Sequence, residues 1–120
     1  MTTQVRLVLD IPIFHKIYDL YKLLHSYHQS ISKSERYTLW QKCENTTLAL
    51  LESLIETSHQ QGEARMQVLY AISNKLDLLK VLIRLAKDIR AIDEQQYIAI
   101  QTFIQEIGRM IGAWIKSVPH

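Results

Sequence analysis

The scarcity of glycine constrains this chain more than any other feature of its sequence. Only three glycines occur among 120 residues, and none precedes Gly62. Tight β-hairpin turns depend on residues such as glycine that adopt positive φ, so a sheet built from short hairpins is a poor fit. Helices joined by short polar loops need no such turns, and the first half of the chain is therefore expected to be helical.

In the first half, apolar residues recur at the three- and four-residue steps of an α-helix. One such face runs from Ile13 to Ile31, with Pro12 near the start of the helix and Asp10 as its candidate cap. A second helix is predicted from the capping-box pattern at residues 32–35, and we expect it to end near Gly62.

The second half predicts two longer helices. The third covers about residues 63–90 and keeps the same spacing of apolar side chains. The fourth begins at a capping box of Asp93 and Gln96, carries an apolar face from Tyr97 to Val118, and ends at Pro119.

Four helices with tight links predict an all-α, up-down-up-down four-helix bundle. A chain of 120 residues is long enough for a single domain, and residues 1–10 are expected to form a short N-terminal arm before it.

The sequence offers little support for an enzyme. It contains no P-loop, no H-E-x-x-H, no G-x-S-x-G and no C-x-x-C pattern, and no cofactor is expected. His25 and His28 share a helix face but lack the carboxylate pattern of a metal-binding bundle, so they are interpreted as solvated or rim residues. The single cysteine, Cys43, lies on an apolar face and is expected to be a buried core residue.

One cysteine cannot form an internal disulfide, which favours a reducing cytoplasm, and neither a signal peptide nor a membrane span is predicted.

The charges are distributed unevenly although the net charge is only +2. Residues 75–92 hold five basic and two acidic side chains, whereas residues 49–64 hold acidic side chains and no Lys or Arg. Lys80, Arg84 and Lys87 form one basic stripe at helical spacing, along the edge of the core face. Such a stripe is often only a solvated face, but repeated in an oligomer it would attract phosphates.

Two further features point to contacts between subunits. The third helix carries a second apolar stripe formed by Leu78, Leu82, Leu85 and Ile89, which is more than one helix of a monomeric bundle usually needs. The fourth helix contains Gly108 and Gly112, and each glycine costs about 1 kcal/mol relative to alanine inside a helix. Close backbone packing would explain this glycine pair, either within the subunit or between subunits.

The fourth helix also carries a motif that is similar to the signature of a known family. Residues 106–116, EIGRMIGAWIK, resemble the signature of the accessory variability determinant (Avd) proteins of diversity-generating retroelements. That family is related to four-helix-bundle proteins encoded by intervening sequences of bacterial ribosomal RNA genes. Residues 37–40 (YTLW), 51–56 (LESLIE) and 74–84 (NKLDLLKVLIR) add weaker matches, and the resemblance covers about residues 10–118.

The resemblance implies a non-enzymatic subunit of a homo-pentameric barrel. It would bind the element's reverse transcriptase, and template-repeat RNA or cDNA, in support of mutagenic cDNA synthesis and retrohoming. Lys80 and Arg84 match a basic pair that contacts the polymerase, with Lys80 in place of an arginine, and Arg109 matches the arginine of the signature. Lys87 extends the basic stripe.

The signature residues Gly108, Gly112 and Trp114 are expected at subunit contacts. The alternative is a stand-alone bundle of the ribosomal intervening-sequence type that binds a protein or an RNA.

Overall fold

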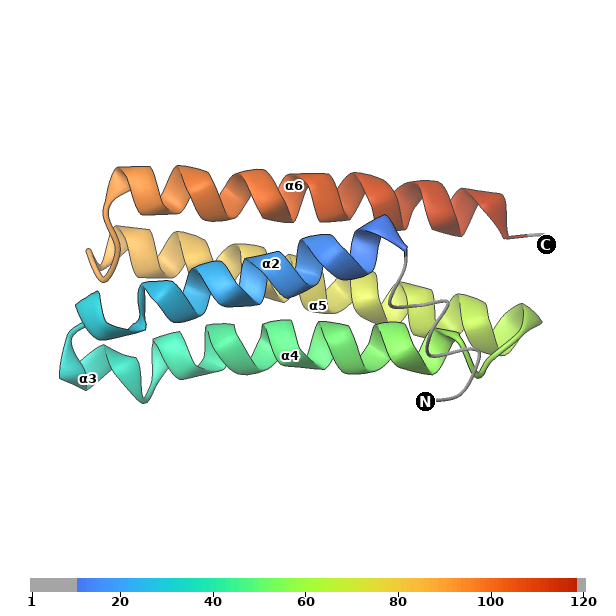
Figure 1. Ribbon diagram of the computed structural model, residues 1–120, viewed down its shortest axis with the longest axis horizontal. Helices are drawn as coiled ribbons and strands as arrows, with labels where there is room; N and C mark the ends of the chain where they lie inside the picture. The colour runs from blue at the N-terminus through green and yellow to red at the C-terminus, as the bar shows by residue number, and fades with distance from the viewer. Residues whose placement is uncertain (1–10, 119–120) are drawn as a thin grey trace.

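The computed structural model describes residues 11–118, so the predicted arm at residues 1–10, the candidate cap Asp10 and the stop at Pro119 lie outside it. Within the described range the chain is helical and contains no strand (Figure 1). Its long helices are α2 (Pro12–Ser26), α4 (Leu39–Thr57), α5 (Gly62–Asp88) and α6 (Glu94–Ser117). Two short elements, η1 (His28–Ser30) and α3 (Lys33–Arg36), connect α2 to α4.

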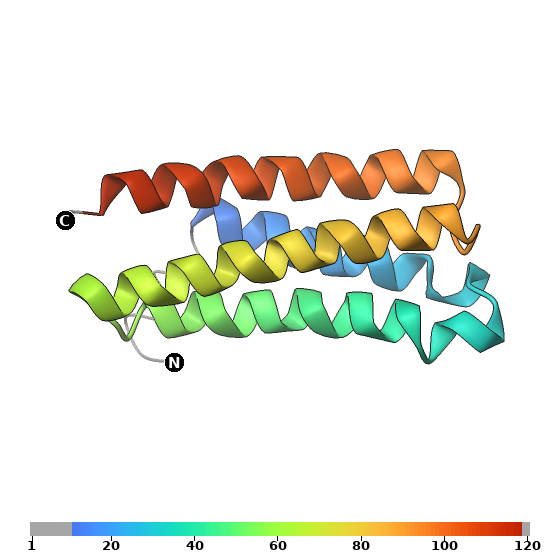
Figure 2. The same cartoon turned by 180° about the vertical axis from the view of Figure 1, so that it is seen from behind.

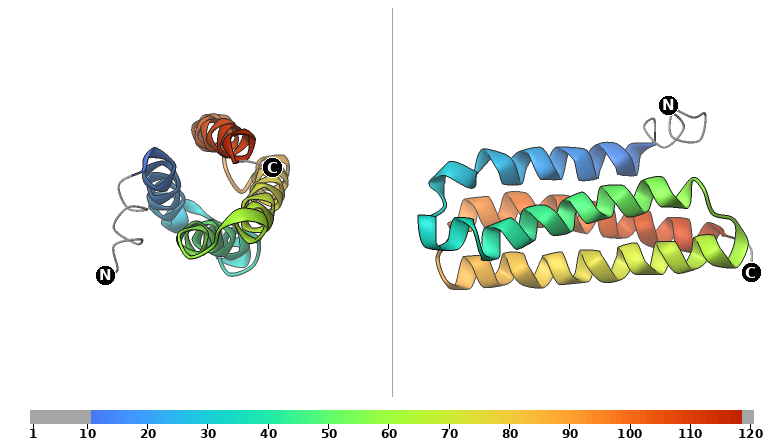
Figure 3. Two further views of the ribbon diagram at one scale, coloured as in Figure 1. Left: turned by 90° about the vertical axis from the view of Figure 1, so that its right-hand side faces the viewer. Right: turned by 90° about the horizontal axis from the view of Figure 1, so that it is seen from below.

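The long helices form the predicted up-down-up-down bundle. Each packs against its neighbour in sequence, and α6 closes the arrangement by packing against α2. The end-on view in Figure 3 shows the four helices at the corners of a square, and Figure 2 shows α5 and α6 side by side in front of α2. The all-helical bundle is therefore confirmed for a single subunit.

The core lies between the four helices and consists mainly of leucine and isoleucine. The faces predicted from the spacing are the buried ones, and Trp40 is the largest side chain that is fully buried. Its indole Nε1 donates a hydrogen bond to the carbonyl oxygen of Leu24 at 3.1 Å, which ties α4 to α2. The central members of this core are Ile17, Leu20, Leu50, Leu69, Leu79, Ile83, Ile100 and Ile107.

The predicted start of the second helix is wrong. The residues from Ser32 onward form only the single turn α3, and at Thr38 the backbone leaves the helical region, with φ −117° and ψ −96°. Ser32 makes no cap hydrogen bond to the backbone. The Glu35 carboxylate does not reach back to it, because its Oε2 instead accepts a 3.4 Å hydrogen bond from the Thr38 hydroxyl.

The first predicted face was also too long, because α2 ends at Ser26. Ile31 is nevertheless buried, since the chain turns through η1 and brings it back to the core.

The link between α5 and α6 contains a left-handed residue that is not glycine. Arg90 has φ +63°. Its N–H donates to the carbonyl oxygen of Lys87 at 3.0 Å, and the N–H of Ala91 donates to the carbonyl oxygen of Ala86 at 2.8 Å. This pair of bonds is the Schellman helix end, whose left-handed position is usually glycine. An L-residue in that conformation costs roughly 1–2 kcal/mol.

The start of α6 is the capping box that the sequence predicts. The backbone N–H of Gln96 donates to Asp93 Oδ1 at 2.8 Å, and the N–H of Asp93 donates to Gln96 Oε1 at 2.9 Å. Two backbone donors that lack helical partners are thereby satisfied, which fixes the position of the α6 N-terminus beside α5.

Candidate interaction surface on helices α5 and α6

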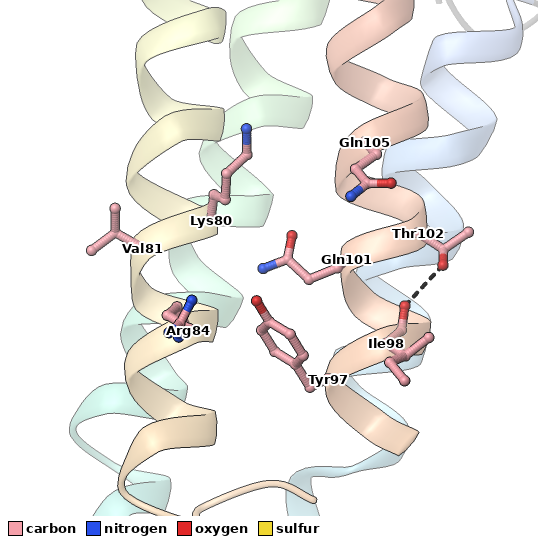
Figure 4. Close-up of a pocket in the computed structure, with 8 residues that line it drawn as sticks. All are labelled: Lys80, Val81, Arg84, Tyr97, Ile98, Gln101, Thr102 and Gln105. Atoms are coloured by element: carbon pink, nitrogen blue, oxygen red, sulfur yellow. Dashed lines mark hydrogen bonds between the residues drawn. The ribbon is translucent and has the colours of Figure 1, made fainter. Parts of the chain in front are cut away.

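A surface groove runs between the C-terminal half of α5 and the N-terminal half of α6, with a volume of about 620 Å³. We call it the α5–α6 groove. Lys80 and Arg84 lie on its α5 side, and Tyr97, Gln101 and Gln105 face them from α6 (Figure 4). The residues that line it are Lys80, Val81, Arg84, Tyr97, Ile98, Gln101, Thr102 and Gln105.

The two groove cations differ in their partners. Arg84 Nε lies 3.3 Å from Asp88 Oδ1 on the same helix, and this hydrogen bond, with a smaller contribution from Tyr97, raises the pKa of Arg84 above its ordinary value. Lys80 is exposed and forms no ion pair with any residue in the range 11–118. The groove therefore presents the Arg84 guanidinium, which is paired with the exposed Asp88 carboxylate, and the Lys80 ammonium group, which is available to a partner.

Lys87 is placed differently from the other members of the predicted basic stripe. Its Nζ lies 4.6 Å from the centre of the Tyr97 ring and 3.4 Å from Glu94 Oε2, so it holds α5 against the start of α6. It does not line the groove.

Arg109 is exposed on α6 and likewise does not line the groove. The structure therefore places Lys80 and Arg84 in the groove, Lys87 beside it against the ring of Tyr97, and Arg109 outside it.

Apolar side chains border the α5–α6 groove and continue along α5. Val81 is 63% exposed and Ile98 is 55% exposed, one on each bank. On α5 the exposed apolar side chains form a row that we call the outer α5 row: Leu78, Val81, Leu85 and Ile89. The sequence placed Leu82 in this row, but Leu82 is half-buried against the core.

The glycine pair of α6 lies in open surroundings. A Cβ added at Gly108 would meet Leu76 Cδ2 at 3.6 Å, which is ordinary van der Waals contact, and one added at Gly112 would meet nothing within 4 Å among residues 11–118. Within that range no backbone of another element approaches either glycine closely, so packing among the described helices does not explain the pair.

Trp114, the remaining signature residue, is half-buried near the C-terminal end of α6, and Figure 1 shows that this end of α6 lies opposite the α5–α6 turn. Trp114 lines an apolar groove of about 590 Å³ between the start of α2 and the end of α6, with Pro12, Ile13 and Met110 among its neighbours.

On the side of the bundle formed by α2 and α4 the buried acid of α4 is paired, although Arg36 Nε in α3 is buried without a hydrogen-bond partner among the described residues. His28 Nδ1 lies 2.9 Å from Glu44 Oε1, and the Glu44 side chain is only 10% exposed. His25 is a more exposed second neighbour of the same carboxylate, at 3.7 Å. Among residues 11–118 there is no group of three or more His, Cys, Asp or Glu side chains able to hold a metal ion.

Cys43 is buried in the core, as predicted. Burial, together with the negative charge of Glu44, raises the pKa of its thiol to about 12. The thiol is therefore protonated near neutral pH and is a poor nucleophile.

Sequence reasoning missed the α6 wall of the groove. It assigned Tyr97 to the core face and gave Gln101 and Gln105 no role. The available signal was their spacing, because positions 97, 101 and 105 lie four residues apart and share one helix face.

Of the helices in the described range, none is both long and apolar enough to cross a membrane. A search of curated proteins finds no match for this chain. The family model described as bAvd-like matches residues 12–118, which is nearly the whole chain and includes the groove, the outer α5 row and the glycine pair. The chain therefore belongs to the bAvd-like family, in agreement with its resemblance to the accessory variability determinant proteins.

Proposed function

We propose that this protein is the non-enzymatic accessory subunit of a diversity-generating retroelement. In this role it works in the cytoplasm as a homo-pentamer that binds the element's reverse transcriptase. It supports mutagenic cDNA synthesis from the template-repeat RNA, and retrohoming of that cDNA, without catalysing polymerisation itself.

The α5–α6 groove is the observation that carries this proposal. Lys80 lacks an ion-pair partner within the described residues, and the exposed side chains of Val81 and Ile98 border it. An exposed cation flanked by exposed apolar side chains can form a protein contact, because neighbouring contacts that exclude water strengthen a charged pair at their centre. Lys80 and Arg84 are also the two positions that match the family's polymerase-contacting pair.

Assembly is supported by surface that a monomer leaves uncovered. Leu78 and Leu85 of the outer α5 row are exposed on one helix face, and a Cβ added at Gly112 of α6 meets nothing within 4 Å among the described residues, which leaves room for another backbone. In a ring, the basic residues of each subunit are repeated around the axis, and the summed potential attracts the phosphates of a polymerase-bound RNA or cDNA.

Co-purification with the reverse transcriptase tests the proposal. The double variant Lys80→Glu with Arg84→Glu is expected to lose at least about 100-fold in polymerase affinity, because two attractive contacts become repulsive. The matched control is Lys33→Glu with Lys42→Glu, which changes the net charge equally at exposed positions on α3 and α4. The control is expected to bind normally.

Polymerase binding that survives the groove reversal would contradict the residue assignment.

Light scattering tests the assembly, since five subunits of 14.1 kDa give a particle of about 70 kDa. A 14.1 kDa monomer would contradict the ring. A stable protein that binds RNA but no reverse transcriptase would favour the stand-alone ribosomal intervening-sequence type of bundle.

A further inference from the structure

Arg90, in the turn between α5 and α6, occupies a position that favours glycine. Its φ is +63°, and its N–H closes the Schellman end of α5. The backbone role would be filled at least as well by glycine. Within residues 11–118, the Arg90 side chain makes no hydrogen bond or ion pair, so no contact inside the subunit accounts for a long cationic side chain here. A strained residue without a structural role is a candidate for function.

The other cations near the turn already have partners. Arg84 is paired with Asp88 and Lys87 with Glu94, whereas Arg90 lies on a shallow hollow of about 370 Å³ between the two helix ends. The preceding residue, Ile89, is 47% exposed and ends the outer α5 row. The turn thus offers a guanidinium beside an apolar side chain.

The charge of the turn indicates which kind of partner it fits. Residues 84–94 contain three basic side chains, Arg84, Lys87 and Arg90, and three exposed acidic ones, Asp88, Asp93 and Glu94. A nucleic-acid backbone, which carries many phosphates, gains little attraction from a turn whose charges balance. A single protein carboxylate is compatible with it, because a guanidinium binds a carboxylate through two parallel hydrogen bonds and at short range.

We propose that Arg90 is a contact residue for a carboxylate on the surface of the reverse transcriptase, with Ile89 packing beside it. This inference rests on the proposed function and extends its binding surface from the α5–α6 groove to the α5–α6 turn. Arginine is kept at a glycine position because its side chain contributes more to the complex than its backbone strain costs the free subunit.

Two variants of Arg90 separate the backbone role from the side-chain role. Arg90→Gly relieves the left-handed strain and is expected to raise the melting temperature by about 2–4 °C. Arg90→Ala removes the guanidinium but keeps the strain, so its melting temperature is expected to match that of the wild type. Both are expected to bind the purified reverse transcriptase about tenfold more weakly, as measured by interferometry on the assembled protein.

Arg90→Lys keeps the positive charge but loses the two parallel N–H donors of the guanidinium. It is therefore expected to bind more tightly than Arg90→Ala but less tightly than the wild type. Full polymerase affinity in Arg90→Gly would overturn the inference about Arg90. If the Lys80→Glu, Arg84→Glu variant still lost polymerase binding in that case, the proposed function would stand without a role for Arg90. Loss of template-RNA binding with unchanged polymerase binding would also overturn the inference about Arg90. Failure of the wild-type protein to bind the polymerase would refute both proposals together.

Discussion

The α2–α4 side and the α5–α6 side of this bundle follow the same helical spacing but differ in how they treat two charged groups, the Glu44 carboxylate and the Lys80 ammonium. On the α2–α4 side, the Trp40 indole is bonded to the Leu24 carbonyl, and the buried Glu44 carboxylate is matched by His28. On the α5–α6 side, Lys80 has no ion-pair partner within the described residues and Val81 is largely exposed.

This difference assigns the two sides different tasks. Groups satisfied inside the subunit stabilise the fold, since an unpaired buried polar group costs about 1–3 kcal/mol. Groups left unsatisfied at the surface contribute little to the stability of one subunit and are available to partners. Substitutions on the α2–α4 side should therefore change unfolding, and substitutions on the α5–α6 side should change assembly and binding.

The largest effect is expected from Trp40→Ala. The substitution removes the largest buried side chain and leaves the Leu24 carbonyl without its donor. We expect the free energy of unfolding to fall by about 3–5 kcal/mol, as measured by urea denaturation. Trp114→Ala is the matched control, because Trp114 is only half-buried and is expected to cost less.

The reactivity of Cys43 reports the burial of the α2–α4 side in the wild-type protein, without any substitution. With its pKa raised to about 12, the thiol should react about a thousandfold more slowly at pH 8 than an ordinary cysteine, and its labelling should continue to accelerate about tenfold per pH unit where an ordinary thiol levels off. Mass spectrometry after alkylation follows the reaction, with protein in urea as the fully reactive control. Rapid labelling of the native protein at pH 8 would contradict the burial of this helix face.

A smaller loss is expected when the buried acid of α4 is shortened. Glu44→Ala leaves His28 without the partner that lies 2.9 Å away, and we expect a loss of about 1–3 kcal/mol in thermal or urea unfolding. Glu52→Ala, an exposed acid on the same helix, is the control and is expected to change stability by less than about 0.5 kcal/mol. Equal effects of the two substitutions would show that the His28–Glu44 contact does not stabilise the fold.

The smallest effect on subunit stability is expected from the double variant Leu78→Asp with Leu85→Asp. Both side chains are exposed in the outer α5 row, so helical content and subunit folding should be nearly unchanged. The mass of the particle in light scattering should nevertheless fall, because charges placed on an apolar contact oppose association. Leu48→Asp, at an exposed apolar position on α4, should leave the mass unchanged.

The sequence predicted the elements of this fold better than the boundaries between them. Apolar spacing identified the four long helices and their buried faces, because the burial of one helix face follows directly from the helical period. The break at Thr38 was missed because it depends on local contacts, such as that between Thr38 and Glu35, rather than on hydrophobic pattern. The left-handed Arg90 was missed because nothing in its chemistry favours that conformation.

The candidate site was only half predictable for a related reason. Lys80 and Arg84 were found from the charge pattern of one helix, but the opposing wall of Tyr97, Gln101 and Gln105 depends on how α6 packs against α5. Helix packing also explains why the exposed row contains Val81 and not the predicted Leu82. Two adjacent apolar stripes differ by a small rotation of the helix, and only the packed bundle fixes that rotation.

Lysine footprinting of the protein with and without the reverse transcriptase tests the division between the two sides most directly. Acetylation reports the exposure of Lys80 in the α5–α6 groove and of Lys33 and Lys42 on α3 and α4 in one experiment. We predict that Lys80 loses most of its reactivity in the complex, whereas Lys33 and Lys42 react as they do in the free protein. Protection of Lys33 and Lys42 with Lys80 still fully reactive would contradict the account.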